Sequence, residues 1–284
     1  MTTKAILKPV RRFLRASFSQ FSGPVMKARG YLGARDLRPE APPGKLTEVS
    51  NPLRDYFESH TQGRGIWKWQ HYFEIYHRHF QKFVGRPVNV LEIGIFSGGS
   101  LGMWKNYFGD KCHIHGVDIQ PECLAYQSDS VTVVIGDQGD RGFWKEFKAK
   151  APRLDVVIDD GSHRPEDQIV TFEELLPQLN PGGVYVCEDV HDTTNRFAQY
   201  LNGFAANLNA SDLDWQDDKI SSPATPFQAA IHSVHLYPYV VVIEKTESRV
   251  QQFVGPKHGT EWQPFISANG TKSSGSMGSR SSQP

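Results

Sequence analysis

Residues 88–100 read VNVLEIGIFSGGS: a short apolar run, a cluster of glycines and the start of a helix-like segment. The run Val88–Ile93 contains several β-branched residues, as buried strands do. A strand that leads through glycines into a helix is the unit from which open α/β sheets are built, and ligands bind beside such a turn. Glycines there let the backbone approach a ligand closely. These residues therefore predict the first strand of a ligand-binding α/β domain.

Strand-like and helix-like runs alternate along the chain after this turn. Further strands are predicted at Ile114–Ile119, Val131–Ile135, Leu154–Ile158 and Val184–Cys187, with helices at Phe143–Ala149 and Gln168–Leu179. Continuous apolar strands that alternate with helices predict a mostly parallel, doubly wound sheet covered on both faces. Pro181–Gly183 predicts a turn just before the fifth strand. Ser233–Tyr237 and Val240–Lys245 predict a C-terminal antiparallel hairpin at one edge of the sheet.

The residues at the strand ends indicate the cofactor. Phe96 stands where the dinucleotide fingerprint has its second glycine, which disfavours a nicotinamide-dependent oxidoreductase. Glu92, two residues before Gly94, instead resembles the E/D-x-G motif of class I S-adenosylmethionine-dependent methyltransferases, which seat the methionine part of the cofactor there. Asp118, after the second strand, can accept hydrogen bonds from both ribose hydroxyls, and Asp137, after the third, occupies the place of the acid that accepts from the adenine amino group. The predicted cofactor contacts are Glu92, Gly94, Ser97, Gly98, Asp118, Asp137, Gln138 and Asp159.

Carboxylates gather where the fourth and fifth predicted strands end. The fourth ends in DDGSH, residues 159–163, and the fifth ends in Glu188 and Asp189. Because neighbouring parallel strands end at one edge, Asp160, Glu188 and Asp189 are expected to meet, and desolvated carboxylates repel each other unless a cation joins them. Ligation by oxygen alone favours Mg²⁺, with Mn²⁺ as the alternative. The competing interpretation is that these acids are helix caps and salt-bridge partners.

A histidine stands beside this predicted metal site. His163 lies three residues after Asp160, on the loop above the strand end. Next to a metal-bound substrate, an imidazole is suited to act as a general base. His191, two residues after Asp189, is the second candidate for this role.

From about residue 67 to residue 192 the chain resembles the metal-dependent sugar O-methyltransferases of the macrolide (mycinamicin) type and the related cephamycin-pathway proteins. The resemblance is carried by LEIGIFSGGSLGMWKNYF, GVDI, GDQGD, IDDGSH and GGVYVCEDVH. It implies a Rossmann-like class I methyltransferase fold in which Asp160, Glu188 and Asp189 hold Mg²⁺ and His163 is the base. It also implies S-adenosylmethionine as cofactor, an acceptor hydroxyl on a sugar or glycosylated metabolite, and assembly as a homo-oligomer.

The segment WKWQHY, residues 67–72, departs in its tryptophans from the family pattern. Two interpretations of it are open, a cap over the cofactor and a wall of the acceptor pocket, so the acceptor stays open as well. A glycolipid, a polysaccharide end and a glycosylated secondary metabolite all fit. A catechol-type O-methyltransferase would share the metal site but prefer a flat aromatic acceptor. A non-catalytic protein of the same fold, docked on a membrane, would not need the acids to bind a metal.

Composition limits the partners and the location. The 284 residues include 31 basic and 31 acidic side chains, so a globally basic nucleic-acid binder is excluded. Three cysteines without C-x-x-C spacing favour a reducing compartment, and a cytoplasmic protein is expected. No run of 18 apolar residues is present in the sequence.

The charge is nevertheless uneven along the chain. Residues 1–35 contain eight basic side chains and no acid. Three interpretations compete for this head: an amphipathic helix that contacts an anionic membrane surface, an organelle transit peptide, and a solvated extension. The predicted organisation is a basic head with a proline-rich linker over residues 1–50, a methyltransferase domain over residues 51–266 and a disordered Ser/Gly-rich tail over residues 267–284.

Overall fold

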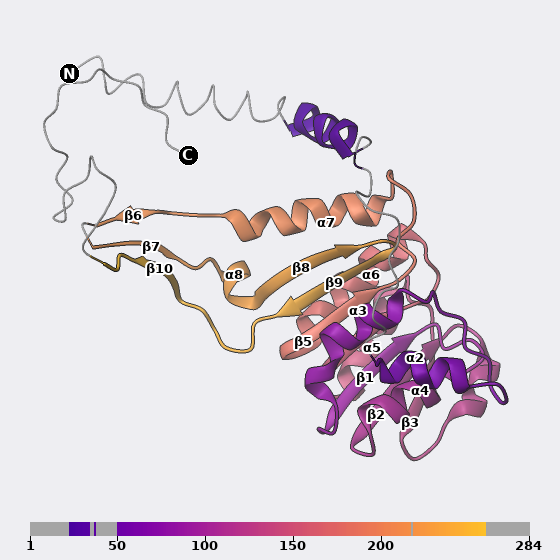
Figure 1. Ribbon diagram of the computed structural model, residues 1–284. Helices are drawn as coiled ribbons and strands as arrows, with labels where there is room; N and C mark the ends of the chain where they lie inside the picture. The colour runs from indigo at the N-terminus through magenta and orange to yellow at the C-terminus, as the bar shows by residue number, and fades with distance from the viewer. Residues whose placement is uncertain (1–22, 35–36, 38–49, 217, 260–284) are drawn as a thin grey trace, which may run out of the picture. The chain divides into compact units, whose positions relative to one another are not determined.

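The computed structural model describes residues 23–34, 37, 50–216 and 218–259 (Figure 1). The chain divides into two units, Met1–Val49 and Ser50–Pro284. In the first unit, residues 23–34 form a helix whose side chains are exposed. The rest of the predicted basic head and the Ser/Gly-rich tail lie outside the described residues, so their interpretations stay predictions. Within the described ranges, no helix is long and apolar enough to cross a membrane.

A seven-stranded sheet of order β3-β2-β1-β4-β5-β9-β8 forms the centre of the second unit (Figure 1). Its strands are β1 (Val88–Ile93), β2 (Cys112–Asp118), β3 (Val131–Ile135), β4 (Leu154–Asp159), β5 (Leu179–Cys187), β8 (Ile231–Tyr237) and β9 (Val240–Lys245). Strands β1 to β5 are parallel, and β9 pairs antiparallel with both β5 and β8. The predicted doubly wound sheet with a C-terminal antiparallel hairpin is confirmed.

Helices cover both faces of this sheet. They are α2 (Pro52–Ser59), α3 (Tyr72–Phe80), α4 (Gly99–Phe108), α5 (Arg141–Lys150), α6 (Pro165–Leu175), α7 (Arg196–Ala206) and α8 (Pro226–Ala230), with short 3-10 turns at Gln81–Phe83, Pro121–Tyr126, Leu176–Gln178 and Asn207–Asn209. One apolar core joins the sheet to α2, α3 and α4 around the buried Trp104, and another joins it to α5, α6 and α7 around Trp144. In β1, Val90 belongs to the first core and its neighbour Leu91 to the second. Burial on both faces explains why β1 is apolar almost throughout.

The fifth strand differs from its prediction. It spans Leu179–Cys187, so the turn predicted at Pro181–Gly183 is wrong, and these residues lie inside the strand. The pairing with β4 shifts its register between Leu154 and Val156, and Gly182 has φ +74°. A bulge accommodates extra residues within a strand and tolerates proline and glycine there. The turn-forming residues therefore produce an irregular strand rather than its boundary.

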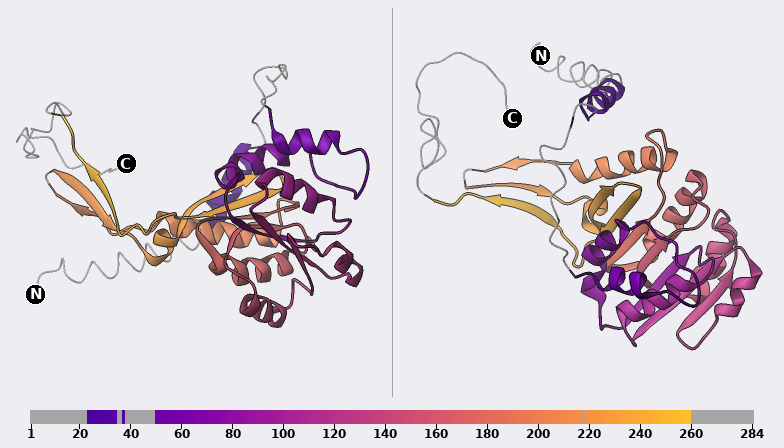
Figure 2. Two further views of the ribbon diagram at one scale, coloured as in Figure 1. Left: turned by 90° about the horizontal axis from the view of Figure 1, so that it is seen from below. Right: turned by 45° about the vertical axis from the view of Figure 1, so that its right-hand side comes forward.

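A separate three-stranded antiparallel sheet has the order β10-β7-β6 (Figure 2). Its strands are β6 (Asp214–Trp215), β7 (Lys219–Pro223) and β10 (Gln252–Pro256). The sequence gives no prediction of this sheet, because β6 has only two residues and every residue of β10 is exposed. The helix predicted over Gln168–Leu179 is also shorter, since α6 ends at Leu175 and Leu179 already begins β5.

Candidate active site

A cavity of about 850 Å³ opens at the carboxyl ends of β1 to β5. Its wall is formed by the segments that follow these strands and by Gly65–Gln70, which precedes α3. In the sheet, β2 and β3 lie on one side of β1, and β4 and β5 lie on the other. The segment that connects β3 to β4 therefore crosses from one side of β1 to the other. Ligands of open α/β sheets bind at such a switch point. The cavity thus lies beside the turn that residues 88–100 predict as a ligand site.

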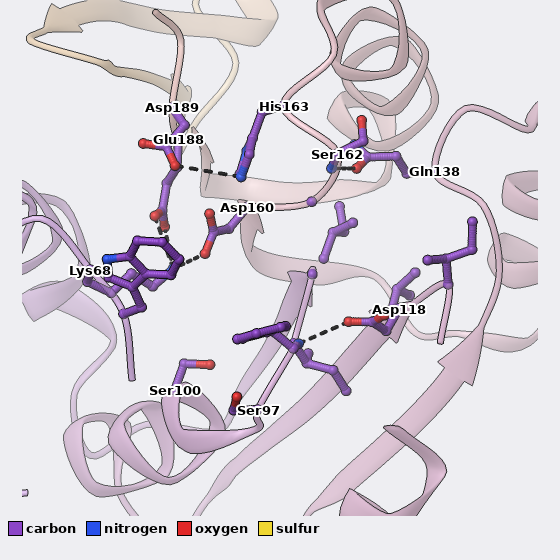
Figure 3. A pocket seen from close by; sticks show the side chains of 18 of the residues that line it. Lys68, Ser97, Ser100, Asp118, Gln138, Asp160, Ser162, His163, Glu188 and Asp189 are labelled. Atoms are coloured by element: carbon purple, nitrogen blue, oxygen red, sulfur yellow. Dashed lines mark hydrogen bonds and ion pairs between the residues drawn. The ribbon is translucent and has the colours of Figure 1, made fainter. Parts of the chain in front are cut away.

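Several predicted cofactor contacts line this cavity, namely Gly94, Ser97, Asp118, Asp137 and Gln138. Asp118 is held by the backbone: its Oδ2 accepts from Phe96 N at 2.9 Å and its Oδ1 from Gln120 N at 2.9 Å. Each carboxylate oxygen keeps a further lone pair. Figure 3 shows Asp118 across the cavity from Glu188 and Asp189. Asp118 is therefore a fixed acceptor at one end of the site.

Three other predicted cofactor contacts, Glu92, Gly98 and Asp159, do not line the cavity. Glu92 is fully buried and accepts hydrogen bonds from Ser100 Oγ at 2.8 Å and Trp104 Nε1 at 3.0 Å. Both donors belong to α4, so Glu92 anchors this helix to β1 and fixes the glycine turn between them. Direct contact of these three residues with a cofactor stays a prediction.

Asp159 and Gln138 connect the ends of β3 and β4. Gln138 Nε2 donates to Asp159 Oδ1 at 3.0 Å, and Gln138 Oε1 accepts from Ser162 N at 2.5 Å. Tyr185 OH donates to Asp159 Oδ2 at 3.0 Å, and burial raises the pKa of Asp159 to about 7. These bonds position the loop that carries His163.

Gly94 permits close contact between the first turn and the DDGSH loop. Its φ is +81°, and a Cβ atom at this position would collide with the backbone carbonyl of Asp160. Asp160 N donates to Ile93 O at 3.0 Å from the same loop. A glycine is therefore required here both by the backbone conformation and by the lack of space.

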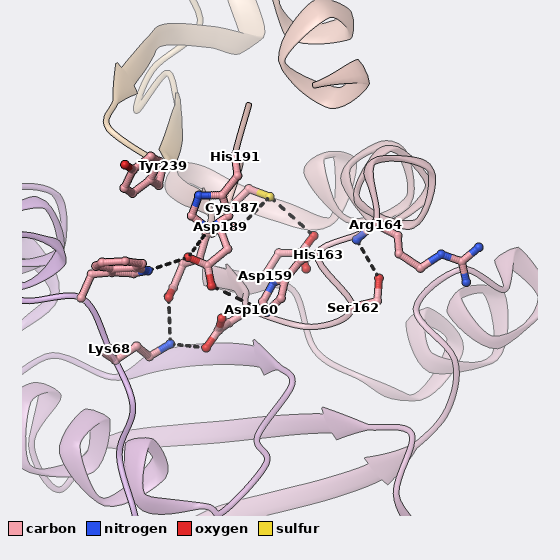
Figure 4. Close-up of polar contacts among 12 residues, drawn as sticks. Lys68, Asp159, Asp160, Ser162, His163, Arg164, Cys187, Asp189, His191 and Tyr239 are labelled. Carbon is pink, nitrogen blue, oxygen red and sulfur yellow. Dashed lines mark hydrogen bonds and ion pairs between the residues drawn. The ribbon is translucent and has the colours of Figure 1, made fainter. Parts of the chain in front are cut away.

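A buried lysine lies within the predicted acidic cluster (Figure 4). Lys68 Nζ is 2.6 Å from Asp160 Oδ2, 3.0 Å from each Glu188 oxygen and 3.8 Å from Glu92 Oε1. Burial lowers the pKa of Lys68, but the charges of these carboxylates outweigh burial and raise it above its ordinary value. Burial and the charge of Asp160 raise the pKa of Glu188, and Lys68 opposes that shift. Both oxygens of Glu188 thus contact an ammonium group.

Asp189 and His163 form the outer part of the cluster. Ligand atoms of Asp160, His163 and Asp189 lie within 4.8 Å of one another. Asp189 Oδ1 accepts from Tyr72 OH at 2.7 Å and from Trp69 Nε1 at 3.0 Å. Its Oδ2 is 3.6 Å from His163 Nε2. The structure therefore brings two predicted metal ligands and the predicted base together, while Glu188 contacts Lys68.

His191, the second candidate base, lies on the other side of Asp189. Its Nε2 is 3.3 Å from Asp189 Oδ1, and its ring centroid is 4.6 Å from that of Tyr239. Trp69 packs beside both rings. Together these rings form an aromatic border at the acidic end of the cavity.

Strained backbone marks the same cavity. Phe96, His163 and Asp189 have φ angles of 41°, 56° and 54°, and all three line the cavity. A non-glycine residue with a left-handed backbone conformation costs on the order of 1–3 kcal/mol of folding free energy, and such residues cluster at functional sites. The strain supports a functional role for this cavity independently of residue chemistry.

Sequence reasoning missed that Lys68 and Tyr72 contact the acids directly. They are 92 and 117 residues away in sequence from Asp160 and Asp189. The sequence interprets segment 67–72 as a cap over the cofactor or a wall of the acceptor pocket, and residues 67–70 and 72 line the cavity. No local pattern, however, relates a lysine there to strand ends that follow so much later.

Comparison with known proteins shows which class of protein the chain resembles. Residues 91–190 match the family described as a methyltransferase domain. The 8-demethyl-8-alpha-L-rhamnosyl tetracenomycin-C 2'-O-methyltransferase of Streptomyces olivaceus is 31% identical over 202 residues, which are 64% of this chain and 52% of that protein. The demethylmacrocin O-methyltransferase of Streptomyces fradiae is 42% identical over 146 residues, 49% of this chain and 35% of that protein. The chain spans about half the length, or less, of the curated relatives it matches.

A solved structure agrees with these relatives. It is the MycE methyltransferase of the mycinamycin biosynthetic pathway in complex with Mg, SAH and mycinamycin VI, with a TM-score of 0.56 and 26% identity over 69% of this chain and 53% of that chain. Residues 91–190 therefore match a methyltransferase domain, and the fold is Rossmann-like. Within that class, the predicted resemblance to sugar O-methyltransferases of the macrolide type is confirmed.

Proposed function

We propose that this protein transfers a methyl group from S-adenosylmethionine to a hydroxyl of a sugar or glycosylated metabolite, in a reaction that depends on a divalent metal ion. The observation that carries the proposal is that one cavity is lined both by Asp118 and by Asp160, His163 and Asp189. A cofactor held at the Asp118 end would meet an acceptor held at the acidic end. The relatives and the solved structure named above support the same activity.

The acidic cluster suits a divalent cation. Four carboxylates gather here: those of Glu92, Asp160 and Glu188 contact Lys68, and that of Asp189 contacts His163. Among the described residues, Lys68 is the one lysine or arginine that forms a salt bridge with any of the four. Carboxylate oxygens are the preferred ligands of Mg²⁺ and Mn²⁺. Asp160, Asp189 and Glu188 would hold the ion, which when bound polarises the acceptor hydroxyl and lowers its pKa.

The protein's own groups then handle the proton. His163 Nε2 accepts the proton of the acceptor hydroxyl, and the Asp189 carboxylate, 3.6 Å away, stabilises the imidazolium that forms. Tyr72 and Trp69 donate to the other oxygen of Asp189 and hold the carboxylate in that position. Fixed geometry of this kind supplies the positioning that methyl transfer requires.

The aromatic border favours a ring-shaped acceptor. Trp69 and His191 of this border line the cavity, and so does Trp67, which is 89% exposed, so a bound acceptor would cover apolar surface there. The faces of sugar rings and of catechols both suit such a surface. A catechol is therefore the second candidate acceptor, and the relatives favour the sugar.

A direct test is transfer of labelled methyl from S-adenosylmethionine to a panel of sugars, glycosides and catechols that bear adjacent hydroxyls. We expect product from glycosides with Mg²⁺ or Mn²⁺ and loss of product when a chelator removes the metal. Turnover that is insensitive to the chelator would refute the metal dependence. Preference for catechols over every glycoside would refute the sugar acceptor.

Cofactor binding gives a separate prediction. Replacing Asp118 by alanine removes the fixed acceptor at one end of the cavity and should weaken binding of S-adenosylmethionine by about 1–3 kcal/mol, because ligand donors lose their partner. Calorimetric titration measures the change. Asp129→Ala, which removes an exposed acid just before β3, is the matched control and should bind like the native protein. Equal affinity in Asp118→Ala and Asp129→Ala would exclude Asp118 as a cofactor contact.

A further inference from the structure

We infer that Lys68 is a tethered cation that competes with the divalent metal for Asp160 and Glu188, and that it thereby keeps metal binding weak and reversible. The inference rests on the proposed metal-dependent function. It concerns a residue that lies far in sequence from the DDGSH and Glu188-Asp189 motifs.

The contacts of Lys68 are those expected of a bound cation. Its Nζ contacts three carboxylate oxygens at 2.6–3.0 Å, one from Asp160 and two from Glu188. Its side chain is only 3% exposed, so water does not replace these partners. An ammonium group has three donors, and the three oxygens satisfy them. Figure 4 shows the Lys68 side chain directed toward Asp160.

These contacts divide the predicted metal ligands into two groups. Glu188 is held by Lys68 through both oxygens, whereas Asp189 is held by Tyr72 and Trp69 and faces His163. Asp160 belongs to both groups, because one oxygen binds Lys68 and the residue also lies within 4.8 Å of His163 and Asp189. An ion at Asp160 and Asp189 is therefore a close neighbour of the ammonium group.

Electrostatics then determines the direction of the effect. Like charges repel strongly in a site with little water, so the ammonium group opposes a divalent cation at Asp160. For the ion to gain the oxygens of Glu188, Lys68 has to leave them. Glu92 Oε1, at 3.8 Å, is the nearest remaining carboxylate oxygen to which Lys68 can move. Part of the binding free energy of the metal is consumed by this rearrangement.

The same contacts explain how the metal-free protein tolerates its buried acids. The side chains of Asp160 and Glu188 are 18% and 1% exposed. An unpaired charge on a side chain so buried strongly destabilises the folded protein. Lys68 compensates them in the absence of metal. The lysine thus acts as an internal substitute for the ion, and the two cations bind in competition.

The test is calorimetric titration of the native protein and of Lys68→Met with Mg²⁺ and Mn²⁺, without substrate. Methionine keeps an unbranched side chain and removes the charge. We expect at least tenfold tighter metal binding by the variant. The matched control is Lys105→Met, because Lys105 Nζ donates to the backbone carbonyls of Asp110 and Cys112 rather than to acids. Its metal affinity should equal that of the native protein.

Thermal unfolding provides the second readout, since Lys68→Met leaves buried carboxylates without a partner. In chelator, the variant should unfold at a lower temperature than the native protein, and saturating Mg²⁺ should raise its unfolding temperature by more than it raises that of the native protein. Lys68→Gln, a polar and neutral alternative, should behave in the same way if Lys68→Met folds poorly.

The outcomes are distinguishable. Metal binding by the native protein with equal or weaker binding by both Lys68 variants would overturn this inference and leave the proposed function intact; Lys68 would then be a group that organises the ligands. Absence of metal binding in all of these proteins would overturn the proposed metal dependence itself, and the inference with it.

Discussion

Replacing His163 by alanine should lower kcat by about 10²–10⁴-fold, because a positioned general base contributes about that much to proton transfer. The variant keeps Asp160, Glu188, Asp189 and the Asp118 end of the cavity, so metal and S-adenosylmethionine should bind with nearly native affinity. Steady-state turnover with labelled cofactor measures the rate, and calorimetry measures both affinities. Added imidazole should restore part of the rate, since the native side chain is 42% exposed and the space that it leaves is open to small molecules.

His191→Ala is the matched control for this experiment. Its imidazole is also half-exposed and lies 3.3 Å from Oδ1 of the same Asp189, whereas His163 lies near Oδ2. Unlike His163, it does not belong to the cluster with Asp160 and Asp189. We expect a loss of less than tenfold. If instead kcat falls by about 10²–10⁴-fold in His191→Ala and stays at the native value in His163→Ala, the base is His191. Asp160→Asn removes one carboxylate charge from the proposed metal site and should lower metal affinity. If His163→Ala lowers metal affinity as much, His163 is a metal ligand rather than a base.

The strands and their carboxyl ends could be predicted because their signals are local. An apolar run followed by glycines identifies β1, and the same reasoning places β3 and most of β2 and β4. Parallel strands end at one edge, so Asp118 and Asp160 follow from strand positions without knowledge of side-chain contacts. The bulge in β5 is different: its proline and glycines read as a turn. They lie inside a strand because Leu179 before them and Val184 after them both pair with β4.

Lys68 illustrates what the sequence could not predict. A lysine is ordinarily a surface residue, and this one is buried only because Asp160 and Glu188 compensate its charge. That compensation exists only once the segment before α3 packs across the ends of β4 and β5. The predicted set of three metal ligands was likewise derived from strand ends alone, and the division of that set between Lys68 and His163 required the tertiary structure.

Gly94→Ala should destabilise the protein by about 2–5 kcal/mol. The substitution combines a left-handed φ of +81°, which costs an alanine roughly 1–2 kcal/mol, with overpacking against the Asp160 carbonyl, which costs typically 1–3 kcal/mol. Denaturant unfolding measures the change in free energy. The Asp160 loop can relieve the collision only by moving away from β1, so metal affinity should fall as well.

Gly85→Ala separates the two contributions. Gly85 has a similar φ of +74°, but a Cβ atom there would meet nothing within 4 Å. Alanine at this position should therefore cost only the backbone strain, about 1–2 kcal/mol, and should leave metal affinity unchanged. Equal destabilisation by the two substitutions would mean that contact with the Asp160 loop contributes nothing, and that Gly94 is required for its backbone angle alone. A larger loss in Gly94→Ala, together with weaker metal binding, would instead show that the turn after β1 fixes the position of the Asp160 carboxylate.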